Sequence, residues 1–283
     1  MSFPKFVDSV KRFLTHYLDM SQDREEEAAS VEAIRAGVEF KGSTILILVF
    51  AIFIASLGLN TNSLQAPGKN PDLTGIGWNN HNAGTYKLEE RLHPTAWTGQ
   101  TACELIRNYE SDQPLFLKVS FARPHSPYDP PKRYLDMYEK ADIPVPFVGD
   151  WCGKYAERKD PEKVAKDAPF ANLGEEYAVN SRRHYYANVT FIDDQIGQII
   201  QALKEKGMYE NAIICYTADH GDMLGDHYHW RKTYAYEGSA KIPYIIKWPS
   251  AMTTQAIKGK RIEQPVELRD FLPTFIELAG GTV

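Results

Sequence analysis

Metal-ligand and cationic side chains crowd into one short stretch, residues 216–232, which reads YTADHGDMLGDHYHWRK. Asp219 and His220 lie just past the apolar run 212–216, which is typical of a buried strand. A carboxylate and an imidazole that leave a strand together can face one divalent cation. Gly221 lets the backbone turn sharply behind them. The alternative is an ordinary turn whose polar residues only cap the next element.

Cationic groups in and before this stretch could hold an anion. The ammonium of Lys232 can neutralise a sulfate or phosphate oxygen. His125 lies in the loop 121–131, whose four prolines exclude regular structure, and it could bind an anionic group or protonate a leaving oxygen. His227 and His229 could line the same pocket. The plainer alternatives are a solvated lysine and structural or surface histidines.

Strands and helices alternate along the chain from about residue 76. The expected elements are helices over 98–109, 175–206 and 268–279, and strands over 114–120, 212–216 and 243–248. This alternation predicts an α/β fold with a mostly parallel sheet covered by helices on both faces. Sites in such sheets lie beyond the carboxyl ends of strands. The loops 121–131 and 217–232 both begin at such ends.

One segment, residues 43–59 (STILILVFAIFIASLGL), carries no charge. A helix of seventeen residues spans ~26 Å, at the short end for a bilayer, so we expect one transmembrane helix ahead of the α/β domain. Arg24, Arg35 and Lys41 precede the segment and only Lys69 follows closely. This bias predicts a membrane-anchored chain with a cytoplasmic N-terminus and the α/β domain outside, or periplasmic. A buried core helix is the alternative.

Composition and loop-forming residues limit the possible functions and the division into domains. The net charge of -5 gives none of the basic footprint of nucleic-acid binding. The three cysteines are too few for a disulfide framework. Residues 64–75 are rich in Asn, Pro and Gly and indicate a junction. We therefore expect an N-terminal helical segment over 1–63, a linker over 64–75 and an α/β domain over 76–283.

Three segments resemble the sulfatase family of the alkaline phosphatase superfamily. They are FLKVSFARPHSPYDPP, YYANVTFIDDQIGQIIQALKEKG and IICYTADHGDMLGDHYHWRKTYAYEGSAKIPYIIKWP, within a likeness over about 66–283. The resemblance implies a sulfuric ester hydrolase that acts on a sulfated small molecule or glycan. It implies that Asp219 and His220 are metal ligands and that His125 and Lys232 bind the sulfate. Calcium is the usual metal of the family, and the histidine at position 220 also suits manganese or zinc.

The sequence also departs from this family. A sulfatase nucleophile lies in a C/S-x-P/A-x-R signature, and the sequence around Cys103, Cys152 and Cys215 does not fit it. The family's N-terminal metal ligands and first strand find no counterpart before residue 66. Residues 1–63 instead resemble the start of an uncharacterised bacterial multi-spanning membrane family.

These departures predict a truncated sulfatase-like domain, joined near residues 63–66 by a gene fusion, a deletion or an assembly error. We expect weak metal binding, impaired turnover and a sheet with an uncovered edge or face. The alternatives are a non-catalytic membrane-anchored remnant, or a phosphoester or phosphonate hydrolase relative.

Overall fold

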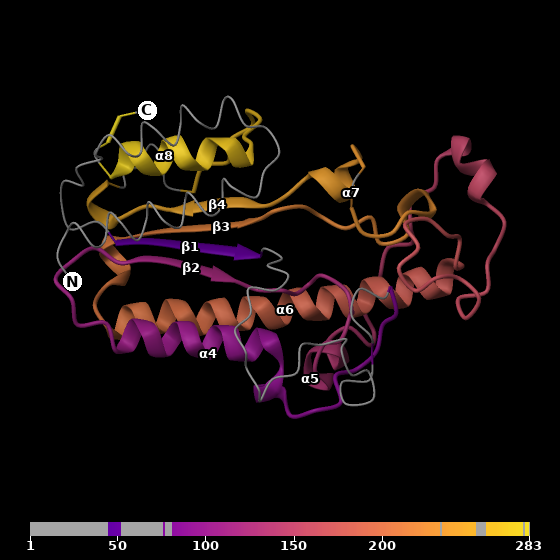
Figure 1. Ribbon diagram of the computed structural model, residues 1–283, viewed down its shortest axis with the longest axis horizontal. Helices are drawn as coiled ribbons and strands as arrows, with labels where there is room; N and C mark the ends of the chain where they lie inside the picture. Colours follow the sequence, from indigo (N-terminus) through magenta and orange to yellow (C-terminus); the bar gives the residue numbers. More distant parts are fainter. Residues whose placement is uncertain are drawn as a thin grey trace.

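A four-stranded sheet forms the centre of the molecule (Figure 1). The structure, a computed structural model, describes residues 81–232, 234–252, 259–279, 281–282 and 76, together with the backbone of 45–51. The strands are β1 (Ile45–Ala51), β2 (Phe116–Ser120), β3 (Ala212–Ala218) and β4 (Tyr244–Lys247). Their order is β2-β1-β3-β4, with β1 parallel to β2 and β3, and β4 antiparallel to β3. The mostly parallel sheet is therefore confirmed.

Strand β1 overturns the prediction of a transmembrane helix at residues 43–59. Ile45–Ala51 form a central strand, paired with β2 on one side and with β3 on the other. A strand with neighbours on both sides in a helix-covered sheet is apolar throughout, so its sequence looks like a short membrane span. The prediction of a missing strand is wrong for the centre of the sheet, because β1 lies between β2 and β3, whereas an uncovered edge stays a prediction.

No helix among the described residues is long and apolar enough to cross a membrane. The other residues of the predicted span, the leader 1–42 and the linker 64–75 lie outside the described residues. The division into domains, the membrane anchor and the orientation of the N-terminus therefore stay predictions.

Two helices cover one face of the sheet and a third covers the other (Figure 1). Helices α4 (Pro94–Arg107) and α6 (Glu175–Glu205) share a core with β2 and β3 that includes Ile106, Val119 and Ile199. On the opposite face α8 (Phe271–Leu278) packs Phe271 and Phe275 against β3. Coverage of both faces is confirmed.

The helix ends follow from local chemistry. Helix α4 starts four residues earlier than expected, because Pro94 suits the first turn and the His93 side chain accepts a hydrogen bond from the Thr95 N–H. Helix α6 ends near Gly207, whose φ of 71° is left-handed. The short helical elements are η1 (Glu90–Leu92), α5 (Lys132–Asp136), η2 (Asp150–Tyr155), η3 (Tyr209–Asn211), η4 (Asp226–Tyr228), α7 (Glu237–Ala240), η5 (Ser250–Met252) and η6 (Leu268–Asp270).

Candidate anion and metal site at the carboxyl edge of the sheet

The two loops rich in chemical groups leave the same edge of the sheet. Ser120 at the end of β2 and Thr217 near the end of β3 both pair with Phe50 of β1. Two strand spacings therefore separate the loop starts, about 10 Å. The parallel register, which sequence reasoning anticipated, is what brings the loop 121–131 and the loop 219–232 together.

Asp219 and His220, the predicted metal ligands, lie side by side at this edge. Asp219 Oδ1 accepts a hydrogen bond from the His220 backbone N–H at 2.9 Å, and His220 Nδ1 donates to the Gly221 carbonyl at 2.8 Å. The other two atoms, Asp219 Oδ2 and His220 Nε2, lie 3.4 Å apart, and each side chain is about a quarter exposed. The two possible metal-ligand atoms, Asp219 Oδ2 and His220 Nε2, therefore lie side by side.

The spacing of these two atoms suits a divalent cation. Two ligands about 2.1 Å from a tetrahedral ion lie about 3.4 Å apart, and two ligands about 2.4 Å from calcium at right angles have the same separation. The pair therefore fits part of a ligand set without selecting calcium over zinc or manganese. Among the described residues no group of three or more His, Cys, Asp or Glu side chains could hold a metal. Metal identity and strength of binding stay predictions.

His125 and Lys232 lie within electrostatic reach of this pair. The pKa of His125 is lowered to about 4, chiefly by burial and then by the charges of Lys232, Arg123 and His220, although the Ser126 carbonyl raises it. Burial also lowers the pKa of Lys232, whereas the carboxylate of Asp219 raises it. The structure thus gathers the four predicted residues at one edge, where His125 is neutral near pH 7. Their roles stay predictions.

Asp222 braces the two loops against each other and was not singled out from the sequence. Its Oδ1 accepts the backbone N–H groups of Leu224 and Arg231 at 3.0 Å each, and its Oδ2 accepts the hydroxyl of Tyr128 at 3.0 Å. Tyr128 is fully buried and belongs to the His125 loop. The sequence signal was the second acid of the 216–232 stretch, two residues after His220, but only the fold shows which loop Asp222 contacts.

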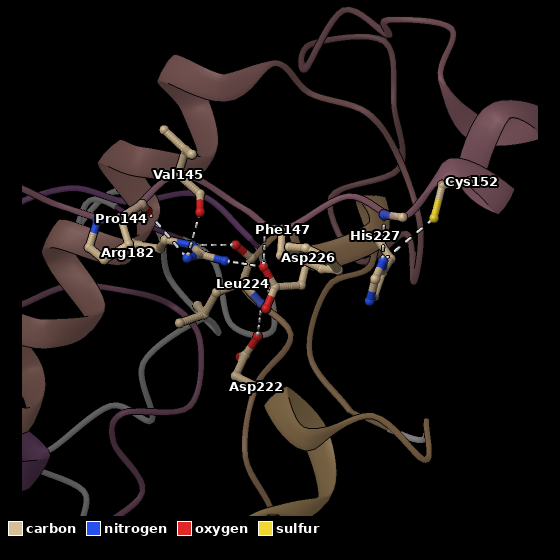
Figure 2. Close-up of polar contacts among 10 residues, drawn as sticks. Pro144, Val145, Phe147, Cys152, Arg182, Asp222, Leu224, Asp226 and His227 are labelled. Carbon is tan, nitrogen blue, oxygen red and sulfur yellow. Dashed lines mark hydrogen bonds and ion pairs between the residues drawn. The ribbon is translucent and has the colours of Figure 1, made fainter.

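Arg182 of α6 holds the far half of the loop 219–232 (Figure 2). It donates from Nε to the Leu224 carbonyl at 3.0 Å and from Nη2 to Asp226 Oδ1 at 2.5 Å. Its Nη1 reaches the carbonyls of Pro144 and Val145. The loop needs this support because Leu224, His227, Tyr228 and Arg231 have positive φ, which costs free energy in non-glycine residues.

His227 and His229 are buried side chains of this loop. His227 Nδ1 accepts a hydrogen bond from the Gly149 N–H at 3.1 Å and lies 3.6 Å from Cys152 Sγ (Figure 2). His229 Nδ1 donates to the His227 carbonyl at 2.6 Å. The two side chains are 9% and 6% exposed, and the Nδ1 atom of each forms a hydrogen bond with a backbone group. A direct contact with substrate stays a prediction for both.

Lys118 is a further cation that sequence reasoning missed. It lies on β2 beside β1, paired with Leu48. Burial lowers its pKa, and the Asp219 carboxylate raises it. A lysine inside an apolar strand was the available signal, since such strands normally exclude charge.

A buried ion pair fixes the base of the His125 loop. Arg123 donates to Asp129 through Nε at 2.5 Å and through Nη2 at 2.8 Å, and both side chains are fully buried. Burial raises the pKa of Asp129, but the Arg123 guanidinium and the His93 ring outweigh it and hold the pKa below its ordinary value. The carboxylate is therefore ionised at neutral pH.

Comparison with known proteins adds independent information. The family model for sulfatases matches residues 60–281, and so begins inside the segment that the sequence assigned to residues 1–63. An arylsulfatase of Clostridium perfringens is 40% identical over 219 residues, which cover 76% of this chain and 44% of that protein. A choline-sulfatase of Rhizobium meliloti is 33% identical and covers 60% of this chain and 32% of its own length. The chain thus spans less than half the length of these relatives.

Solved structures share the fold. A phosphonate monoester hydrolase of Agrobacterium radiobacter superimposes with a TM-score of 0.62 at 19% identity, over 84% of this chain and 58% of that one, which shows the fold alone. A phosphonate monoester hydrolase from Silicibacter pomeroyi gives a TM-score of 0.56 at 26% identity, over 78% of this chain and 45% of that one.

Proposed function

The chain belongs to the sulfatase family, and on that premise we propose that its carboxyl-edge site binds sulfate esters as in a sulfuric ester hydrolase, with impaired turnover. The observation that carries this proposal is the meeting of Lys232 and His125 with Asp219 and His220 at the ends of two parallel strands. A cation, a neutral imidazole and a metal-ligand pair together suit an anionic ester.

Each residue of the site has a role that follows from its charge. The Lys232 ammonium stabilises the sulfate oxygens as a point charge in a partly desolvated site. His125 is neutral when the site is empty of anion, because burial lowers its pKa. A bound sulfate raises that pKa, so His125 takes up a proton that it can give to the leaving oxygen. A divalent cation held by Asp219 and His220 would polarise a sulfate oxygen.

Impaired turnover is proposed because the chain offers no matching nucleophile. The sequence holds no Cys in the C/S-x-P/A-x-R pattern. Cys103, Cys152 and Cys215 are buried and free of disulfides. Burial raises the pKa of all three thiols, that of Cys215 to about 12, so none supplies a thiolate at neutral pH. Cleavage of a sulfate ester through a covalent intermediate needs such a group.

Calorimetric titration with inorganic sulfate and hydrolysis of an aryl sulfate test the proposal. Lys232→Ala should weaken sulfate binding about tenfold or more, since a charge-assisted contact contributes about 1.5–3 kcal/mol. Lys241→Ala is the matched control, because its ammonium is exposed and pairs with Glu237 on α7. Unchanged sulfate binding by Lys232→Ala would refute the site. Hydrolysis well above that of the Lys232→Ala variant would refute impaired turnover.

Metal titration tests the second half of the site. Any increase in sulfate affinity that manganese or calcium causes should disappear in Asp219→Asn. The sulfate affinity measured in the presence of a chelator should stay unchanged in this variant. Tight stoichiometric binding of either metal by the purified chain would contradict the weak binding that we propose, and would count against a non-catalytic remnant.

A phosphonate or phosphoester hydrolase is the second candidate. The structural neighbour at 26% identity, a phosphonate monoester hydrolase, favours it. The same cations would hold a phosphonate. Parallel titrations with methyl sulfate and phenyl phosphonate separate the two candidates: tighter binding of the phosphonate, lost in Lys232→Ala, would favour the second.

A further inference from the structure

Six aromatic side chains form a continuous surface around His227 and His229. We use the name aromatic surface for Phe147, Trp151, Tyr155, Phe170, Tyr234 and Tyr236. The His227 ring lies 5.4, 4.7 and 4.8 Å from the rings of Phe147, Trp151 and Tyr236. The His229 ring lies 5.7, 6.1 and 4.4 Å from the rings of Tyr155, Phe170 and Tyr234. The two histidines are therefore the buried supports of one connected set of rings.

Much of this surface faces water. Phe147 is 70% exposed, Trp151 50%, Phe170 46% and Tyr236 36%. Trp151 and Tyr236 are stacked, 13° from parallel. Large apolar rings gathered in one exposed place usually mark a binding surface, whereas isolated exposed apolar residues need no explanation.

The aromatic surface adjoins the proposed sulfate site. His229 and Tyr234, whose rings are in contact, lie three residues before and two residues after Lys232. A chain advances at most about 3.8 Å per residue, so Lys232 Cα lies within about 8 Å of Tyr234 Cα. At the other end of the loop, the Gly221 N–H donates to the Ser239 carbonyl at 2.7 Å, which ties the segment after Tyr236 to the metal-ligand pair.

The supports are rigid as well as close. His227 Nδ1 accepts the Gly149 N–H, His229 Nδ1 donates to the His227 carbonyl, and Arg182 binds the turn between them and the site. Rings held in this way lose little conformational freedom when a ligand covers them, which favours affinity.

We propose that the aromatic surface binds the organic group of the sulfate ester through an apolar ring face. The sulfate end of this proposal rests on the proposed function. The substrate class is then a sulfate ester of a ring alcohol. Two sources share this chemistry, an aryl ring and the C–H face of a pyranose, because both present a flat apolar face with polar groups at its edge.

Calorimetry on the full chain tests the proposal with matched probes. Phenyl sulfate and glucose 6-sulfate carry a ring, methyl sulfate carries the charge alone, and phenol and methyl glucoside carry the ring alone. Ring-bearing sulfates should bind about three- to tenfold more tightly than methyl sulfate. Trp151→Ala should remove that gain and leave methyl sulfate unaffected, whereas Trp151→Phe should keep most of it. The larger gain, aryl or pyranose, identifies the source.

Trp97→Ala is the control, because Trp97 is 36% exposed on α4, away from the aromatic surface. Equal binding of phenyl sulfate, glucose 6-sulfate and methyl sulfate would overturn the proposal, and so would an unchanged gain in Trp151→Ala. Loss of a dimer in Trp151→Ala, seen by sedimentation, would assign the surface to a second copy and also overturn it. If no sulfate binds but phenol or methyl glucoside binds in a Trp151-dependent way, the sulfate site fails and the ring site stands.

Discussion

The buried pair of Arg123 and Asp129 should make Asp129→Asn one of the most destabilising single changes in the described part of the chain. The carboxylate receives two N–H groups from the guanidinium, at 2.5 and 2.8 Å, in a fully buried place. Asparagine has nearly the same shape but no charge, so a cation stays buried without this partner.

The size of the loss follows from the geometry. Two unit charges about 4 Å apart attract by about 4 kcal/mol at an effective dielectric constant of about 20. Removal of one partner from a buried pair usually costs about 3–5 kcal/mol, which agrees. We therefore expect Asp129→Asn to lower the free energy of unfolding by about 3–5 kcal/mol.

Urea unfolding at pH 7, followed by tryptophan fluorescence and circular dichroism, measures this loss. Asp136→Asn is the matched control, because Asp136 is 51% exposed and pairs with Lys132 one helical turn away. It should cost less than about 1 kcal/mol. In the double variant Arg123→Met with Asp129→Asn, we expect a loss at least about 2 kcal/mol smaller than the sum of the single losses. A loss below about 1 kcal/mol for Asp129→Asn, or additive single losses, would refute the reasoning.

Three further predictions concern individual residues. Gly221→Ala should lower the free energy of unfolding in urea by about 1–3 kcal/mol, because the new Cβ would collide with the Gly238 carbonyl oxygen. Gly197→Ala is the control, since the space around Gly197 is open, and it should stabilise α6 by about 0.5–1 kcal/mol. An unchanged stability in Gly221→Ala would contradict the prediction. Burial lowers the pKa of His81 from 6.5 to about 4, so the unfolded chain binds more protons than the folded chain between these pH values. The free energy of unfolding should therefore fall by about 2 kcal/mol between pH 7 and pH 5. If the His81→Gln variant shows the same fall, His81 is not its source. Arg182→Met should lower sulfate affinity and stability together, because four contacts with the site loop and its neighbours disappear; unaltered sulfate binding in a destabilised variant would limit Arg182 to folding.

Sequence reasoning was right where local chemistry and the fold agree. The apolar run 212–216 is a strand and the apolar face over 175–206 is a helix. The loops that follow β2 and β3 carry His125, Asp219 and His220 to one edge, because parallel strands end on the same side. These features depend on residues near one another in sequence, or on a rule common to all parallel sheets.

Other features could not be inferred in this way. The site is supported by contacts between residues about 10 to 90 positions apart in sequence, which involve Arg182, Asp222 and Tyr128. No local sequence pattern predicts such contacts. His227 and His229 looked equally suited to a pocket or to the surface. The structure instead buries them as supports of exposed rings, because the chain from 147 to 170 folds over them.

The sequence by itself determined that residues 45–51 are apolar enough to leave water, and that Asp219, His220 and Lys232 share one loop. The tertiary structure alone decided what those apolar residues become. Burial of apolar surface is nondirectional, and a membrane helix and a doubly covered strand satisfy it equally. The choice depends on the backbone, whose N–H and C=O groups pair within a helix or with neighbouring strands. Here β2 and β3 supply those partners on both sides of Ile45–Ala51, so the segment completes the sheet that carries the site.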